Sequence, residues 1–140
     1  MNWQGKKVLV HRKGATRALP AGHPQNPQHY MDTGHPAIVP GSMGTSSYLM
    51  VGLPQAEQTF YSINHGAGRA MSRTEAKKSI KIQDFEEKMS GILYNKPFGV
   101  IADEAPQAYK DIDLVIETLV EAGITKKVAK LQPLAVIKGD

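Results

Sequence analysis

A stretch rich in proline and glycine, residues 19–36, most constrains how this chain can fold. It contains four prolines and two glycines, at Pro20, Pro24, Pro27, Pro36, Gly22 and Gly34. Each proline fixes φ and lacks a backbone donor, so neither a helix nor a central strand can continue through the stretch. We therefore predict a long surface loop over residues 19–36, of the kind that is often functional or a variable insertion.

Outside this loop, short apolar runs alternate with turn residues, which favours an α+β fold of mixed short strands and a few helices. Strands are predicted at residues 7–10, 37–39, 48–53, 60–63 and 128–137, the last edged by Pro133. Helices are predicted at residues 69–80, 84–89 and 106–121. The capping box Ser72-Arg73-Thr74-Glu75 leaves two starts open for the first helix, at Gly66 or only after Ser72.

Length and composition limit the class of protein. The 140 residues suffice for one compact domain, residues 1–140. Cysteine is absent, which excludes disulfides and thiolate zinc sites. Without a bilayer-length apolar run or the order of a secretory signal, we expect a cytoplasmic protein with no membrane attachment. The formal net charge of +4 is a mild bias toward anionic partners.

The sharpest motif is His-Gly-Ala-Gly-Arg at residues 65–69, directly after a predicted strand. Glycines let the backbone approach a phosphate, and a helix opening there would add the positive end of its dipole. Arg69 would supply bidentate donors to phosphate oxygens. His65 would then lie beside a bound phosphate as nucleophile, acid–base group or metal ligand. A plain turn histidine before a glycine-rich helix start fits these residues equally well.

Two other segments combine features of anion or nucleotide sites. His11 precedes a basic loop, residues 12–17, which suits a polyanion, and His11 itself could ligate a metal. A solvated basic loop is the simpler alternative. The serine- and glycine-rich loop at residues 40–47 could surround a nucleotide with amides and hydroxyls, although most such loops are only turns.

Other polar residues are expected to be structural or solvated. His23, His29 and His35 lie in the proline-rich loop with only Asp32 nearby, so we expect exposed loop residues rather than metal ligands. Asp111 and Asp113, placed on the predicted long helix with Tyr109, are expected on its solvated face. The chain terminus around Lys138 would ordinarily be frayed.

Taken together, these segments resemble the RtcB family of RNA ligases. The shared segments occur in the family's order at residues 11–18 (HRKGATRA), 40–48 (PGSMGTSSY), 65–69 (HGAGR), 108–113 (AYKDID) and 136–139 (VIKG). The resemblance implies the C-terminal portion of the RtcB-like fold. The family's upstream part supplies a cysteine, further metal-binding histidines and an asparagine-containing nucleotide loop, and none of these is present here. We therefore expect apolar surface that the missing part would cover.

The resemblance also implies an activity. Such ligases use GTP and Mn²⁺ to join RNA 3′-phosphate or 2′,3′-cyclic phosphate ends to 5′-hydroxyl ends, in tRNA splicing and RNA repair. His65 matches the histidine that attacks the α-phosphate of GTP and carries GMP as a phosphoramidate. The alternative is a truncated, non-catalytic fragment that binds nucleotide or RNA, or assembles with a partner chain. A metal hydrolase built on the loop histidines is a weaker third idea.

The family's binding residues transfer to matching positions of this chain. His11 matches a manganese ligand. The positions that match the nucleotide site are Pro40, Gly41, Ser42, Met43, Ser47, Gly66, Ala67, Gly68, Tyr109 and Lys138. The cations expected to contact RNA or phosphate are Arg12, Lys13, Arg17, Arg69 and Arg73. The natural RNA, whether tRNA halves or broken RNA, and the oligomeric state are left open by the sequence.

Overall fold

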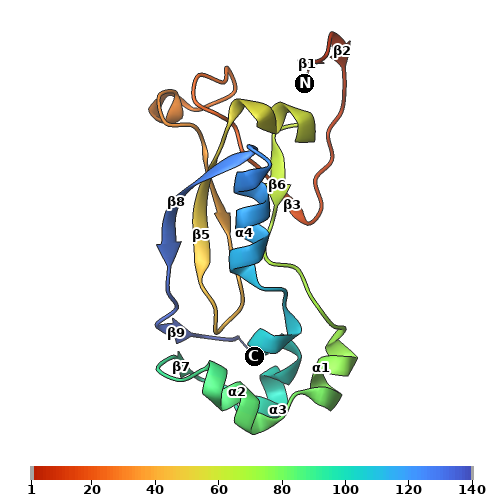
Figure 1. The fold of residues 1–140 in the computed structure, drawn as a ribbon, viewed down its shortest axis with the longest axis vertical. Helices are drawn as coiled ribbons and strands as arrows, with labels where there is room; N and C mark the ends of the chain where they lie inside the picture. The colour runs from red at the N-terminus through yellow and green to blue at the C-terminus, as the bar shows by residue number, and fades with distance from the viewer. Residues whose placement is uncertain (1, 140) are drawn as a thin grey trace.

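The computed structural model describes residues 2–139 and consists of a sheet-containing body with a group of short helices beneath it (Figure 1). The body is built on an antiparallel sheet of order β4–β5–β8, with β4 (Pro36–Val39), β5 (Ser47–Gly52) and β8 (Thr125–Leu131). Helix α4 (Ile112–Glu121) packs along one face of this sheet (Figure 1). Strands and helices mix in the way expected, which confirms the α+β class.

Strand alternation explains which face of the sheet is buried under α4. Successive side chains of a strand point to opposite faces, so Val39 and Met50 lie on the face toward the helix. They form the main core with Ile112 and Ile116 of α4, and Val39, Met50 and Ile116 are completely buried. The other face of the sheet has no helix of residues 2–139 against it.

A second pair of strands and the N-terminal hairpin flank this body. β3 (Ala15–Arg17) pairs antiparallel with β6 (Ser62–Asn64), which follows a 3-10 segment at Pro54–Thr59. β1 (Asn2–Trp3) and β2 (Lys6–Lys7) form a small hairpin. The hairpin is anchored by Trp3, whose ring centroid lies 4.7 Å from that of Phe60.

The lower group contains the remaining elements. They are α1 (Arg73–Ser79), α2 (Ile82–Lys88), β7 (Leu93–Tyr94), α3 (Phe98–Ile101), the 3-10 turns Ala102–Glu104 and Pro106–Ala108, and β9 (Ala135–Val136). Phe85, Met89 and Ile101 form its core, to which Met43 contributes from the serine-rich loop. β9 pairs in parallel with β7, so the end of the chain returns to this group (Figure 1).

The proline-rich loop at residues 19–36 is confirmed as a long segment between strands, with one 3-10 turn at Gln28–Tyr30 and the first residue of β4 at its end. It is folded on itself: the Asn26 side chain donates to the Pro20 carbonyl at 2.8 Å, and both residues are buried. The Gly34 amide donates to the Tyr30 carbonyl at 2.9 Å, with φ of +83° at Gly34.

Several predicted boundaries were wrong in the first half of the chain. The strand predicted at residues 7–10 was wrong in extent: β2 is Lys6–Lys7, and residues 8–10 are not part of a strand. The strand predicted at 60–63 begins only at Ser62, because Phe60 and Tyr61 have φ of +54° and +53° and turn the chain there. The strands at residues 37–39 and 48–53 are confirmed within one residue or so.

The helical predictions needed similar corrections. The first helix begins only after Ser72, whose hydroxyl accepts from the Glu75 amide at 3.1 Å, so the capping box marks the true start. The long helix begins at Ile112 with Asp111 as its cap, whereas Pro106 belongs to a separate 3-10 turn. The last strand is divided at Pro133 into β8 and β9. No helix within residues 2–139 has the length and hydropathy needed to cross a bilayer.

Candidate nucleotide site around His65

Three backbone hydrogen bonds bring four of the motif segments together around His65. The His65 amide donates to the Gly14 carbonyl at 3.0 Å, and the Ala67 amide donates to the Pro40 carbonyl at 2.9 Å. The Lys110 amide donates to the Gly68 carbonyl at 3.0 Å. The basic loop, the serine-rich loop, the glycine turn and the segment of Tyr109 therefore meet at one place.

The strand pairing explains this convergence. β3 and β6 pair with Ala15 opposite Asn64, so the turn at Gly14 folds back beside His65. Glycine at position 66 allows close contact with the serine-rich loop, since a Cβ atom there would lie a tight 3.0 Å from the Pro40 carbonyl oxygen. The His65 side chain is exposed at this junction. It is thus accessible to a ligand rather than packed in the core.

The glycine turn itself is not the start of a helix. We expected a helix dipole to support a phosphate at residues 66–68, and this expectation was wrong because α1 begins at Arg73. Gly68 instead has φ of +75°, and the following residues bridge to the segment of Tyr109. Any anion bound here would be held by turn amides and side chains alone.

The serine-rich loop is a tight turn held by its own hydroxyls. The Ser42 amide donates to Thr45 Oγ1 at 2.7 Å, and the Ser42 and Thr45 hydroxyl oxygens are 2.9 Å apart. A Cβ atom at Gly41 would collide with the Ser46 carbonyl and with Thr45 Oγ1. Met43 points into the lower core, so only its backbone is available to a nucleotide. Ser47 opens β5 at the end of the loop.

The guanidinium of Arg69 makes hydrogen bonds to backbone carbonyls of the same chain. Its Nε donates to the Met71 carbonyl at 3.0 Å, and its Nη2 donates to the Asp103 carbonyl at 2.7 Å. It also lies 5.1 Å from the centre of the Tyr109 ring. Arg69 therefore braces the turn after His65, and Tyr109 belongs to this bracing segment rather than to the long helix.

Arg12 also makes hydrogen bonds within the chain, whereas Lys13, Arg17 and Arg73 are exposed. Its Nε donates to Ser62 Oγ at 2.7 Å and its Nη2 to the Phe60 carbonyl at 2.9 Å. Burial, and secondarily the nearby charge of Arg17, lower the pKa of Arg12. Lys13 and Arg17 are exposed on the basic loop. Arg73, on α1, is 72% exposed and lies 3.9 Å from the Asp103 carboxylate.

Lys138 is held by specific contacts, so the expectation of a frayed terminus was wrong. Its amide donates to Asn95 Oδ1 at 2.9 Å, and its carbonyl accepts from Asn95 Nδ2 at 3.1 Å. Its ammonium group pairs with the Glu104 carboxylate. Lys138 lines a hollow of about 310 Å³ that shares no lining residue with the hollow beside Tyr109. Asp103 also lines the hollow of Lys138, and its carbonyl accepts from Arg69.

Known proteins share this arrangement of motifs. The sequence profile of the family described as "RtcB: tRNA-splicing ligase RtcB" matches residues 1–139. This chain belongs to the RtcB family. A tRNA-splicing ligase RtcB from Aeropyrum pernix is 44% identical over 137 residues, and one from Methanococcus maripaludis is 49% identical over 138 residues. A third, from Methanocaldococcus jannaschii, is 50% identical over 137 residues.

The RtcB match covers nearly all of this chain but a minor part of those relatives. It includes 96%, 96% and 95% of the chain, against 28%, 29% and 14% of the respective relatives. Most of the length of an RtcB protein therefore lies outside the residues described here. Parts of an RtcB site contributed by that remainder have no counterpart in this structure.

The histidines do not assemble a metal centre within residues 2–139, where no three histidine, aspartate or glutamate side chains gather as a metal site. His11 is exposed and lines an apolar groove with Phe60. Of the loop histidines only His29 is exposed as expected. His23 and His35 are half-buried because their rings pack edge-on against Tyr61 and Tyr30, at centroid distances of 4.5 and 5.3 Å.

Sequence reasoning missed several residues that shape the site. Asn95 and Glu104 fix Lys138 although they lie far from it along the chain, and no local pattern marks either of them. Asp113 was expected only on a solvated face. It accepts from the Tyr48 hydroxyl at 2.7 Å and from Lys130 Nζ at 2.8 Å. The alternation of β5 does place Tyr48 toward α4, which is the one signal that could have indicated this contact.

Proposed function

We propose that this chain supplies the nucleotide-accepting histidine of an RNA ligase that joins RNA 3′-phosphate or 2′,3′-cyclic phosphate ends to 5′-hydroxyl ends. The main support is the exposed imidazole of His65 at the junction of the glycine turn, the serine-rich loop and the basic loop. The reaction class follows the relatives, which are named tRNA-splicing ligases. A cytoplasmic location and broken RNA or tRNA halves as substrates belong to the same proposal.

The chemistry requires an accessible, neutral imidazole nitrogen. That nitrogen attacks the α-phosphorus of GTP, a phosphorus–nitrogen bond forms, and the bond to the pyrophosphate oxygen breaks. The GMP then passes to the RNA 3′-phosphate, and the 5′-hydroxyl displaces GMP as the RNA bond forms. The residues around His65 suit this role because amides of the glycine turn can approach phosphate oxygens closely. Arg69 acts as a positioning residue that fixes the turn.

The nucleotide would contact loops already brought together by the fold. We propose that Pro40, Gly41, Ser42, the Met43 backbone and Ser47 border it on one side. Gly66, Ala67 and Gly68 would border its phosphate. Tyr109 and Lys138 are proposed for the guanine end, although they line separate hollows in this structure. A nucleotide that contacts both residues would have to bring these two hollows together.

Manganese dependence is proposed from the family and not from a site in this chain. Residues 2–139 lack a cluster of three carboxylate or imidazole ligands, so they do not fit a complete manganese centre. His11 is retained as a single proposed ligand, with further donors from RtcB residues outside this chain.

The decisive experiment is covalent labelling. The chain is incubated with Mn²⁺ and GTP labelled on the α-phosphate, together with the part of the Methanococcus maripaludis relative that lies outside the match. We expect an acid-labile label on the 140-residue chain. A His65→Ala variant should lose the label, while His29→Ala, which alters another exposed histidine, should keep it. Equal labelling of His65→Ala and wild type would refute the assignment.

The second candidate is a non-catalytic fragment that binds RNA or nucleotide. It is favoured by the small share of the relatives that this chain spans, 28% and 29% for two of them. It predicts RNA binding that weakens with salt and no covalent label even in the presence of the complementary part. The labelling experiment therefore separates the two functions.

A further inference from the structure

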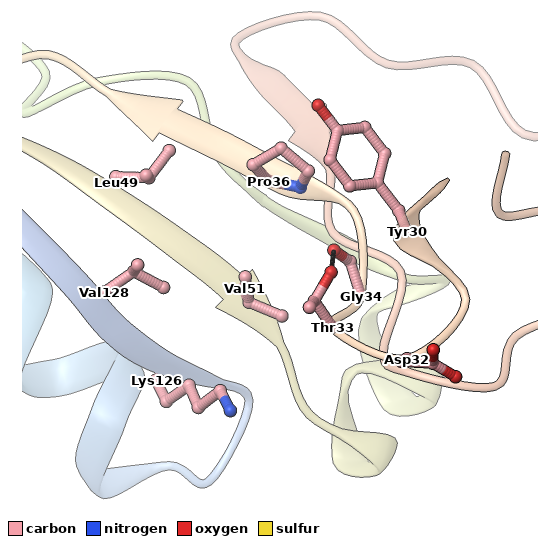
Figure 2. A pocket seen from close by; sticks show the side chains of 9 residues that line it. All are labelled: Tyr30, Asp32, Thr33, Gly34, Pro36, Leu49, Val51, Lys126 and Val128. Carbon is pink, nitrogen blue, oxygen red and sulfur yellow. Dashed lines mark hydrogen bonds between the residues drawn. The ribbon is translucent and has the colours of Figure 1, made fainter. Parts of the chain in front are cut away.

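The sheet face opposite α4 is rich in apolar residues, and residues 2–139 cover it only in part, where Gly34 of the proline-rich loop packs against the buried Val51. Figure 2 shows its centre, where Leu49 and Val51 of β5 lie between Pro36 of β4 and Val128 of β8. These side chains line a hollow of about 380 Å³. Tyr30 and Thr33 of the folded proline-rich loop border it (Figure 2).

The exposed residues around this hollow extend the apolar surface. Ile38 is 61% exposed, Val128 53% and Leu131 49%. Ile38 lies on the outer face because its neighbours Ala37 and Val39 are buried under α4. Leu131 pairs with Ser47, which places it on the same face as Leu49. An antiparallel sheet that faces water ordinarily alternates apolar with polar residues. Here the outer face is largely apolar as well, with the charged Lys126 and Asp32 at the edge of the hollow.

A bulge adds one more apolar side chain to this face. The pairing of β5 with β8 shifts between Leu49 and Met50, so that Val128 falls between the partners Ala129 and Lys127. The extra residue directs Val128 into the hollow with Leu49 (Figure 2). Three adjacent strands thus contribute to one continuous patch, which is typical of a buried interface rather than of scattered surface residues.

The charges argue against a second copy of this chain as the occupant. β8 is an edge of the sheet and has exposed lysines at 126, 127 and 130. Lysines on an edge strand oppose pairing with another chain, and the formal net charge of +4 adds mutual repulsion between copies. In contrast, more than two thirds of the RtcB relatives' length lies outside this chain.

We propose that this outer sheet face is the docking surface for the part of the RtcB fold that lies outside this chain. An apolar element of that part would fill the hollow between Tyr30, Leu49 and Val128 and complete a two-sided core around the sheet. The inference rests on membership in the RtcB family and not on the chemistry of His65. None of the residues in this face contributes to the turn around His65, so the two can be altered independently.

The test uses co-expression. The probe is the part of the Methanococcus maripaludis relative outside the match, tagged and produced together with this chain. We expect the two to co-purify. Ile38→Asp and Val128→Asp should each weaken the complex about 30-fold or more, since they place a charge at the centre of an apolar interface. The matched control is Leu114→Asp on α4, where Leu114 is 63% exposed away from this face and should have no effect.

Each outcome decides the proposal. Failure to co-purify would overturn it, as would a complex that Leu114→Asp weakens more than Ile38→Asp does. A dimer of this chain alone that Ile38→Asp dissociates would identify a second copy as the occupant and also overturn it. For the chain alone, a dye that fluoresces on apolar surface should bind less to Ile38→Asp than to Leu114→Asp. Docking with no label on His65 would refute the proposed ligase chemistry and leave this inference intact.

Discussion

Arg12 and Arg69 have the sequence context of phosphate-binding residues, yet each satisfies carbonyl groups of the chain. Arg12 donates to the carbonyl of Phe60, where two successive residues have positive φ and leave the regular strand. Arg69 donates to the carbonyls of Met71 and Asp103, which belong to segments far apart in the sequence. A guanidinium has several donors in a fixed plane, which suits it to join carbonyls from separate segments. At the scale of the residue, these arginines therefore stabilise the site before any ligand binds.

This role predicts a difference between two neighbouring arginines. Arg69→Ala should lower the free energy of unfolding by about 2–3 kcal/mol, because it removes two hydrogen bonds to carbonyls and the contact with the Tyr109 ring. Arg73→Ala should change it by less than about 0.5 kcal/mol, since Arg73 is largely exposed. Urea unfolding followed by circular dichroism measures both. Equal effects of the two substitutions would contradict the bracing role of Arg69.

The serine-rich loop is the element that most depends on glycine. Gly41 faces the Ser46 carbonyl and Ile112, and Gly44 packs against Pro106 of the lower group. The loop therefore connects the sheet to the lower helices through close backbone contacts, and it also borders the proposed nucleotide. Its shape is determined by packing on both sides.

Gly41→Ala should destabilise the chain by about 1–3 kcal/mol, because the added methyl collides with backbone atoms that cannot yield easily. Gly99→Ala is the matched control: it lies in α3 with open space around its Cβ position, and it should stabilise by about 0.5–1 kcal/mol. Thermal unfolding of both variants gives the comparison. A stable Gly41→Ala chain would show that the loop adapts more freely than its contacts indicate.

A polar contact joins α4 to the sheet and depends on pH. Hydrogen bonds from Lys130 and then from Tyr48 lower the pKa of Asp113. A lowered folded-state pKa contributes stability above the ordinary value of 3.8, and this stability is lost as the pH falls through the lowered pKa. Both Asp113 and Lys130 are about half exposed, so the contribution is reduced by solvent.

Asp113→Asn should therefore cost about 1 kcal/mol or less at pH 7, where the carboxylate is ionised. Wild type and variant should converge below the ordinary aspartate pKa, as the wild-type carboxyl becomes protonated. Urea unfolding at a series of pH values between neutral and strongly acidic measures the difference. A constant difference across that range would rule out the ion pair as its cause.

For the whole molecule, the exposed cations of the basic loop lie on an element separate from β8, which carries exposed lysines of its own. If the basic loop contacts RNA phosphates, Lys13→Ala and Arg17→Ala should each reduce the salt dependence of RNA binding by about one unit of slope. The loss should be similar for different RNA sequences. Lys127→Ala on β8 removes an equal charge elsewhere and should reduce the slope less. Filter binding at several salt concentrations provides the measurement, and equal slopes for all three variants would contradict this contact surface.

The sequence by itself determined the family and the class of fold, and it drew attention to the segments that the fold brings beside His65. Motif order indicated the RtcB family. Short apolar runs between turn residues predicted β4 and β5, because this signal depends only on neighbours along the chain. The capping box at Ser72 was likewise a local signal, since its donor is three residues away.

Only the tertiary structure decided which polar groups meet. The apolar run at residues 8–10 has strand propensity, yet it lies outside any strand, because strand formation depends on the tertiary context as well as on propensity. Arg69 donates to the Asp103 carbonyl, and Lys138 contacts Asn95 and Glu104. These partners are too far apart in the sequence for a periodic pattern to predict them. Periodicity determines which face of its element a side chain occupies, whereas tertiary packing determines which residues it contacts. The positions of Lys138 and Tyr109 in separate hollows, and the exposure of much of the outer sheet face, are therefore results of the tertiary structure.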